Sequence, residues 1–248
     1  MNLERKDMVT TPANQWPAAT SITQRRQQQS RDRQIALTAN TIDWGLPRPS
    51  VTSTAKRLLD IVGALVGLAI VAVLLLPIAI AIQLDHPGPL FFGQTRYGYQ
   101  GRPFRIWKFR SMVPNADAYQ HTVANEAQGL IFKNKEDPRI TRIGRLLRRT
   151  SLDEIPQFFN VLTGEMSLVG TRPPIQNEVA QYQPHHWQRL AIKPGITGQW
   201  QTGGRSSITD FEQIVAMDLD YQKNWSIWKD IRIIVKTITV VFGSKDAC

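Results

Sequence analysis

Cysteine is almost absent from this chain of 248 residues, because Cys248 is the only one. A single thiol excludes an internal disulfide and any metal cluster built from thiolates. Cys248 is also the last residue, so it does not form a C-terminal prenylation box. Residues 1–15 contain no apolar run, and we therefore expect no secretory signal peptide.

Acidic residues are scarce relative to basic ones. Twenty Asp and Glu stand against thirty Lys and Arg, which gives a net charge of +10. This excess points to a polyanionic partner: nucleic acid, an anionic membrane surface or a phosphorylated substrate. The basic residues are spread over many segments, and no helix-turn-helix, zinc or RNA-binding signature is present. We therefore expect no nucleic acid among the partners.

One segment lacks charge altogether. Residues 61–82, "IVGALVGLAIVAVLLLPIAIAI", form a run of 22 uncharged residues. As a helix this run would be roughly 33 Å long, enough to cross a hydrocarbon core of about 30 Å. Helices buried in soluble domains are rarely apolar on every face over such a length. The sequence therefore predicts a protein that lies in or on a membrane.

Pro77 divides this apolar segment. An interior proline removes a backbone hydrogen bond and costs about 3 kcal/mol or more. Basic residues flank the segment on both sides, which favours a re-entrant helix with both ends at the cytoplasmic side. A single kinked span is the alternative, and the residues alone leave the two open. The flanking residues are Lys56 and Arg57 before the segment and Arg96, Arg102, Arg105, Lys108 and Arg110 after it.

The chain as a whole divides into three regions. Residues 1–50 are polar and predict a disordered or loosely helical cytoplasmic tail. We expect residues 51–86 to hold the membrane helix and residues 87–248 to form one further domain. We expect an α+β fold, mostly helical, with two short strands within residues 89–112. Helices are predicted at 115–128, 137–149, after residue 153, at 175–183, 210–222 and 226–242, with a glycine-rich loop at 192–207.

The last predicted helix is amphipathic. Its apolar residues recur at spacings of three and four, and its basic residues lie on a different face. Such a helix suits the headgroup plane of a membrane, but it could also pack on the protein's own core. The sequence leaves these alternatives open. The apolar stripe consists of Trp228, Ile231, Val235, Ile238 and Phe242, and the basic residues are Lys229, Arg232 and Lys236.

The stretch "RRTSLDEIPQFFN", residues 148–160, contains two adjacent carboxylates, Asp153 and Glu154. Ser151 and Glu154 fit a capping box, so the pair could simply begin a helix. The same carboxylates follow Arg148 and Arg149 closely. An ionised carboxylate can bind Mg²⁺ or attack phosphorus, and arginines can hold phosphate oxygens. Capping and phosphoryl-transfer chemistry both remain open on these residues alone.

Four motifs follow one another along the chain: "KRLLDIVGA", "GPLFFGQTRYGYQGRPFRIWKFRSM", "DPRITRIGRLLRRTSLDEIPQFFNVLTGEMSLVGTRP" and "KPGITGQWQTGGRS". In this order they resemble the bacterial sugar transferases, which are monotopic polyprenyl-phosphate hexose-1-phosphate transferases. The resemblance extends from about residue 55 to about residue 242. Four motifs in one order are far more specific than any one of them.

The resemblance implies transfer of a hexose-1-phosphate from a UDP-sugar to polyprenyl (undecaprenyl) phosphate, with release of UMP. This step initiates exopolysaccharide, capsule or O-antigen synthesis. Asp153 is implied as the nucleophile that forms a covalent phosphosugar intermediate, and Mg²⁺ is implied at Asp153 and Glu154. The family fold implies a re-entrant segment broken at Pro77, at the cytosolic face of the bacterial inner membrane. With no further membrane span expected before the catalytic core, the chain resembles the minimal catalytic form of this family.

Arg148 and Arg172 match family arginines, and Arg148 is implied in phosphate binding. The sequence departs from the family at Thr171, where a proline is usual. We add Lys108, Arg110, Lys193 and Arg205 as candidate phosphate or nucleotide ligands, each with a solvated surface charge as the alternative. The sugar and the oligomeric state stay open, a homodimer being one option. A non-enzymatic membrane adaptor and a membrane-tethered nucleic-acid binder are the rival functions.

Overall fold

A computed structural model describes residues 22–126, 130, 134, 136–204, 208 and 210–243 of the chain. Its longest element is the helix α3 (Thr54–Asp85), which contains the whole charge-free run. The helix begins with a side-chain cap, because Ser53 Oγ accepts a hydrogen bond from the amide of Lys56. In the part of the chain that the structure describes, α3 alone is long and apolar enough to cross a membrane.

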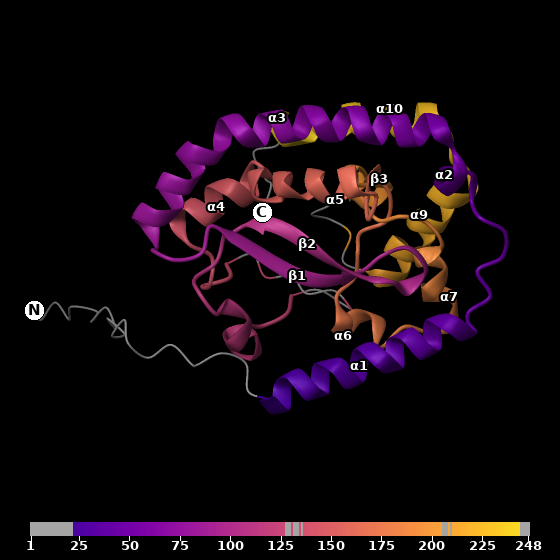
Figure 1. Cartoon of the computed structure of the whole chain (residues 1–248), viewed down its shortest axis with the longest axis horizontal. Coiled ribbons are helices and arrows are strands. Elements are labelled where there is room, and N and C mark those ends of the chain that lie inside the picture. The colour runs from indigo at the N-terminus through magenta and orange to yellow at the C-terminus, as the bar shows by residue number, and fades with distance from the viewer. Residues whose placement is uncertain are drawn as a thin grey trace, which may run out of the picture.

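Pro77 lies inside α3 without interrupting it, so the predicted break is absent as a separate loop. In Figure 1, α3 runs along the top of the molecule, and its C-terminal part curves downward at the left. A helix can continue through a proline if it bends. The bend moves the preceding turn away from the proline ring, and one backbone hydrogen bond is lost. The segment is therefore one curved helix rather than two helices joined by a break.

α3 has two different apolar faces. One face packs on the domain through Ala64, Gly67, Ile78 and Ile82. At Gly67 the absence of a side chain is required, because a Cβ there would overlap the ring of Phe158. The opposite face is exposed along the whole helix. Its exposed residues are Leu58, Val62, Leu65, Val66, Ile70, Val73, Leu76, Ile80 and Leu84.

The last helix, α10 (Ile227–Gly243), lies along the same face of the molecule as α3 (Figure 1). Of its predicted apolar stripe, Trp228, Val235 and Ile238 are exposed and Ile231 lies at the border of exposure. The alternative in which this stripe packs on the protein's own core is therefore wrong. The core-facing side of the helix is instead carried by Asp230 and Ile233. The side chain of Phe242 lies outside the description.

The predicted pair of strands is confirmed. β1 (Phe91–Tyr97) and β2 (Pro103–Phe109) form an antiparallel hairpin in which Phe92 lies opposite Lys108. A second pair, β3 (Ser167–Val169) and β4 (Gly195–Thr197), is parallel and was not predicted. Part of the predicted glycine-rich loop therefore belongs to a sheet. Strands of three residues leave too little periodicity to detect from sequence.

Several predicted helices are confirmed, including α4 (Arg142–Arg149), α9 (Phe211–Lys223) and α10. The helix expected at 115–128 is a short 3₁₀ segment, η2 (Ala116–Thr122), and residues 127 and 128 lie outside the description. The remaining elements are α2 (Pro49–Thr52), η1 (Tyr99–Gly101), η3 (Leu152–Gln157), α5 (Phe158–Thr163), α6 (Gln176–Val179), α7 (Pro184–Trp187), η4 (Gln188–Ala191) and α8 (Gln199–Gly204).

The polar N-terminal region is partly a packed helix, α1 (Ile22–Thr41). Ile35 and Ala39, four residues apart, are buried against Tyr97 and Trp187. The hydroxyl of Tyr97 also donates to Asp32. Of the two predicted alternatives, disordered or loosely helical, the helical one describes this segment, and two apolar residues on one face dock it. Residues 1–21 lie outside the described part of the chain.

Candidate active site

The two predicted carboxylates lie in the 3₁₀ helix η3, between α4 and α5. Ser151 precedes them with φ of 55°, a left-handed conformation that turns the chain sharply after α4. The Ser151 side chain makes no capping hydrogen bond, so the capping box is not formed. Asp153 is 6% exposed, whereas Glu154 is half-buried. Capping by Ser151 therefore does not explain the pair.

Lys108 reaches the same place from strand β2, which lies against η3. Its Nζ lies 2.7 Å from Oε1 of Glu154, and both side chains are partly exposed. The structure thus brings together three of the predicted site residues, Lys108, Asp153 and Glu154. The ion pair fixes one oxygen of Glu154 and places a positive charge at the carboxylate pair.

Arg148 stands in the last turn of α4, and its Nε donates to Ser111 Oγ at 2.9 Å. Gly144 lets α4 approach this segment, since a Cβ there would overlap the carbonyl of Ser111. The start of α4 is held by the end of α3, because Asp85 Oδ2 accepts from the amide of Ile143 at 2.9 Å. The orientation of Arg148 therefore depends on the C-terminal end of the apolar helix.

Apolar packing ties the carboxylates to the same end of α3. Ile78 and Ile82 form a buried cluster with Leu147, and Leu152 and Ile155 pack against it. Leu152 and Ile155 are the residues on either side of the carboxylate pair. Burial of such side chains contributes about 1.5–3 kcal/mol each. The pair is thereby held at a fixed position beside the part of α3 that follows Pro77.

Arg96 on β1 is a site residue that sequence reasoning missed. Its Nη1 donates to the carbonyl of Pro173 at 3.0 Å, and its buried Nε has no hydrogen-bond partner among the described residues. Burial, followed by the charge of Arg172, lowers the pKa of Arg96 to about 10, while Glu178 and Glu154 act in the opposite direction. Arg96 therefore lies within electrostatic reach of Arg172 and Glu154.

Arg172 is held by a second carboxylate. Its Nη1 lies 3.2 Å from Oε1 of the buried Glu178, whose Oε2 accepts from the amide of Ile175. Arg172 and Glu154 both lie within electrostatic range of Arg96. One guanidinium group can donate two parallel hydrogen bonds to phosphate oxygens. Two such groups can therefore hold a diphosphate beside a carboxylate.

Three other predicted ligands are not at this place. Arg110 is buried and donates to the carbonyls of Pro87 and His86, so it braces the loop after α3. Lys193 lies at the N-terminal end of α3, in a cavity that Arg57 also lines. From residue 57 to residue 78, α3 rises by roughly 32 Å, so this cavity is far from the carboxylate pair. Arg205 lies outside the described residues.

A cluster of His185, His186 and Glu212 has the residue types of a metal site. His186 is buried, and its Nδ1 accepts from the amide of Gln183 at 3.0 Å. Its proton is therefore on Nε2, which lies 2.7 Å from Glu212. A protonated Nε2 has no lone pair for a metal, so the arrangement forms a hydrogen-bonded cluster.

Comparison with known proteins places this geometry in a family. The model of the bacterial sugar transferase family matches residues 51–244. Galactosyl transferase CpsE of Streptococcus agalactiae is 51% identical over 189 residues, which cover 75% of this chain and 42% of that protein.

Two relatives are named UDP-glucose:undecaprenyl-phosphate glucose-1-phosphate transferase. The protein from Escherichia coli is 42% identical over 82% of this chain and 44% of its own length. The protein from Caulobacter vibrioides is 40% identical over 82% of this chain and 74% of its own length. The chain thus spans less than half of the first two relatives and about three quarters of the third. The family match and these identities show that this chain belongs to the bacterial sugar transferase family.

Proposed function

We propose that the protein transfers a hexose-1-phosphate from a UDP-sugar to undecaprenyl phosphate. The observation that carries this proposal is the buried Asp153 next to Glu154, which is paired with Lys108 and lies within electrostatic range of Arg96. A nucleophilic carboxylate next to clustered cations is the set of groups that phosphoryl transfer between anions requires. The printed names of the relatives support UDP-sugar and undecaprenyl phosphate as the substrates.

In the first displacement, a carboxylate oxygen of Asp153 forms a bond to the sugar-side phosphorus of the donor. The bond from this phosphorus to the bridging oxygen of the diphosphate breaks, and that oxygen leaves with UMP. Arg96, Arg172 and Lys108 lower the energy of the charge that develops on the phosphate oxygens. The product of this step is a phosphosugar joined covalently to Asp153.

In the second displacement, an oxygen of undecaprenyl phosphate attacks the same phosphorus. The bond between Asp153 and phosphorus breaks, which restores the carboxylate and gives the polyprenyl-diphosphate sugar. Two displacements avoid the direct attack of one phosphate dianion on a diphosphate, in which repulsion between the substrates opposes the reaction. No proton has to be transferred in either step.

The donor set at the site fits a magnesium ion. Asp153 and Glu154 are adjacent carboxylates in η3, and Mg²⁺ in phosphoryl transferases is usually held by one or two carboxylates and the substrate phosphates. Lys108 orients Glu154 through its Oε1. When bound, the ion would neutralise charge on the diphosphate. We propose Asp153 and Glu154 as its ligands.

We propose that α3 is re-entrant and that the catalytic domain lies at the cytosolic face of the inner membrane. Both ends of α3 are attached to the same domain, Lys56 to Asp230 at one end and Asp85 to Ile143 at the other. A straight transmembrane helix would place these ends on opposite sides of the bilayer. α3 and α10 both run along the top of the molecule in Figure 1, and each carries exposed apolar side chains, which supports a partly immersed surface.

UMP release tests the reaction. The protein in nanodiscs is supplied with undecaprenyl phosphate, Mg²⁺ and one of several UDP-sugars, including UDP-glucose and UDP-galactose. We expect release with one donor and a loss of at least about 1,000-fold in Asp153→Asn. Asp43→Asn is the matched control, because Asp43 has an exposed carboxylate that accepts from the amide of Gly45.

The covalent step has its own readout. Donor without lipid acceptor should add the mass of one hexose phosphate to the intact protein, and Asp153→Asn should show no such adduct. Full activity in Asp153→Asn would contradict the nucleophile while leaving the transferase reaction in place. The absence of UMP release from a folded protein with every nucleotide sugar would instead favour the adaptor function.

A further inference from the structure

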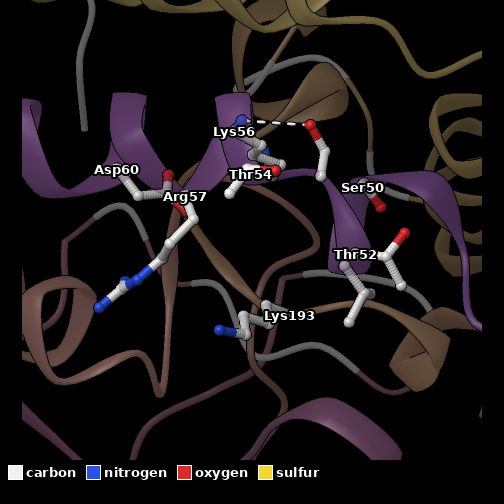
Figure 2. Close-up of a pocket in the computed structure, with 9 residues that line it drawn as sticks. Ser50, Thr52, Thr54, Lys56, Arg57, Asp60 and Lys193 are labelled. Carbon is white, nitrogen blue, oxygen red and sulfur yellow. Dashed lines mark hydrogen bonds between the residues drawn. The ribbon is translucent and has the colours of Figure 1, made fainter.

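A cavity of about 370 Å³ lies at the N-terminal end of α3, remote from the carboxylate pair. It is lined by the short helix α2, by the first turns of α3 and by Lys193, which precedes β4 (Figure 2). Its volume is at the lower end of the range for small-molecule sites. Most of its lining groups are hydroxyls and cations, so a polar ligand would fit it better than an apolar one.

Ser50 is the informative residue of this lining. It is 6% exposed, and its Oγ is buried without a hydrogen-bond partner among the described residues. A buried hydroxyl that lacks a partner costs about 1–3 kcal/mol, and such groups are rare in native proteins. Because Ser50 lines the cavity, rotation about χ1 can bring this hydroxyl to a ligand there.

The cations of the cavity point to the charge of that ligand. Arg57 and Lys193 extend toward the same side of the cavity in Figure 2, and both lie 3.6–3.8 Å from the position of a Cβ at Gly164. Arg57 donates to the carbonyls of Val161 and Leu162, at 2.8 Å each. Lys193 makes no ion pair among the described residues. Burial lowers the pKa of Lys193, and the neighbouring Arg57 adds to this effect.

The carboxylates nearby do not cancel this charge. Lys56 is paired with Asp230 at 2.6 Å, and Asp60 accepts from Ser167 Oγ and from the amide of Leu168. Three cations therefore face two carboxylates, which leaves one positive charge in excess. The N-terminus of a helix as long as α3 adds about half a positive charge. The amide of Lys56 is already capped by Ser53, but those of Thr54 and Ala55 precede the first i→i−4 bond and can donate to an anion.

The exposed apolar face of α3 begins with Leu58, one turn after the helix starts. The cavity therefore lies at the boundary between the apolar surface and the polar end of the helix. In a bilayer, lipid phosphates lie at this boundary, next to the hydrocarbon core. Soluble phosphates of the cytosol reach the same position, so the chemistry of the ligand has two sources.

We propose that this cavity binds a phosphate group, with Lys193, Ser50 and the first turn of α3 as its ligands. The site is separate from the Asp153–Glu154 pair and does not depend on the proposed reaction. The phosphate is supplied either by an anionic phospholipid headgroup or by a soluble phosphate. In either case a bound anion satisfies the buried hydroxyl and compensates the adjacent cations.

Binding is measured on the full chain in an uncharged detergent, without donor or acceptor substrate. One arm titrates dioleoyl phosphatidylglycerol and counts bound lipids by native mass spectrometry. The other arm titrates inorganic phosphate by calorimetry. The variants are Lys193→Gln and Ser50→Ala, and Lys223→Gln is the control, because Lys223 is an exposed lysine of α9 that carries the same charge.

We expect the apparent dissociation constant to rise about tenfold in Lys193→Gln and about threefold in Ser50→Ala, and to stay within about twofold in Lys223→Gln. Ser50→Ala removes an unsatisfied hydroxyl, so its melting temperature without ligand should equal or exceed that of the wild type. This combination, weaker binding in a protein that is no less stable, is not expected of a hydroxyl with a structural role.

Each outcome decides the proposal. Lipid binding with this variant dependence assigns a phospholipid, and variant-dependent binding of inorganic phosphate alone assigns a soluble phosphate. Failure to bind in both arms, or equal binding in Lys193→Gln and Lys223→Gln, overturns the site. A lower melting temperature of ligand-free Ser50→Ala overturns the role of the hydroxyl. If Lys193→Gln does not fold, Ser50→Ala carries the test.

Discussion

The two ends of α3 are attached to the protein by different interactions. At the N-terminal end, Lys56 Nζ lies 2.6 Å from Asp230, which also accepts from the hydroxyl of Tyr221 at 2.6 Å and from Trp225 Nε1 at 3.0 Å. At the C-terminal end, aliphatic side chains such as Ile78 pack against the segment that carries the carboxylate pair. Polar contacts predominate at the first end, whereas apolar contacts and one hydrogen bond, from the amide of Ile143 to Asp85, hold the second.

Because of this difference, the two ends of α3 tolerate displacement to different degrees. A buried ion pair with several partners tolerates one arrangement only, because any shift leaves a charge unsatisfied. Apolar contacts have no direction, so they tolerate small displacements at modest cost. The N-terminal end therefore fixes where α3 lies on the domain. The C-terminal end, which holds the carboxylate pair in place, tolerates small displacements at a lower cost than the N-terminal end.

The largest effect on stability is expected at the polar end. Asp230→Ala leaves Lys56 buried without its partner, which should lower the free energy of unfolding by about 3–5 kcal/mol. Replacement of both charges, in Lys56→Met with Asp230→Leu, should recover most of the loss. Chemical denaturation in detergent measures both. If the single variant proved as stable as the wild type, the contrast between the two ends would be lost.

A smaller effect is expected in the middle of α3. Gly67→Ala would place a methyl group in the ring of Phe158, and such overpacking costs about 1–3 kcal/mol. Phe158→Leu, combined with Gly67→Ala, should restore part of the stability because it removes the overlap. Thermal unfolding of the single and double variants measures the coupling. Additive losses would show that α3 and α5 do not approach each other here.

At the C-terminal end, Asp85→Ala removes the acceptor for the amide of Ile143 and should cost about 1 kcal/mol. Since α4 carries Arg148, a displaced α4 should also lower turnover by about tenfold. Asp85→Asn keeps an acceptor oxygen and should lose less of both. UMP release and thermal unfolding are measured on the same samples. A loss of stability without any loss of turnover would show that this end does not position the site.

The smallest effect concerns acid stability beside the polar end. Hydrogen bonds from Gln199 and Asn224, and then from Lys229, lower the pKa of Asp220 from 3.8 to about 2. Because the folded value is the lower one, this contribution is complete above about pH 4 and is lost as the pH falls toward 2. Asp220→Asn should therefore flatten the decline in stability between these values. Melting temperatures across this range test the sign.

Features that are local in the chain could be predicted from the sequence. The apolar run of α3, the β1–β2 hairpin and the amphipathic helices follow from composition and spacing, and the carboxylate pair stands out in its motif. The ion pair between Lys108 and Glu154 could not be predicted, because 46 residues separate them. For the same reason nothing in the sequence distinguished Lys108, at the site, from Arg110, which braces the loop after α3.

Other features depend on contacts that no periodicity reports. α1 is strongly polar, and only its docking on Tyr97 and Trp187 explains why it is ordered. In the sequence, Arg96 cannot be told apart from any other arginine of a hairpin. Only the fold brings it within range of the charges of Arg172 and Glu154. Neither the β3–β4 pair nor the cavity at Ser50 could be anticipated, since both join segments more than 25 residues apart.

The attachment of α3 along its length has a mechanical consequence. A membrane helix that is not attached to a domain can tilt independently when the bilayer is thicker or thinner. α3 is fixed to the domain at both ends and in the middle, so it can tilt only together with the whole protein. Lipids with longer or shorter acyl chains should thus raise or lower the reaction centre relative to the membrane surface. For the proposed reaction we therefore expect turnover to depend on bilayer thickness.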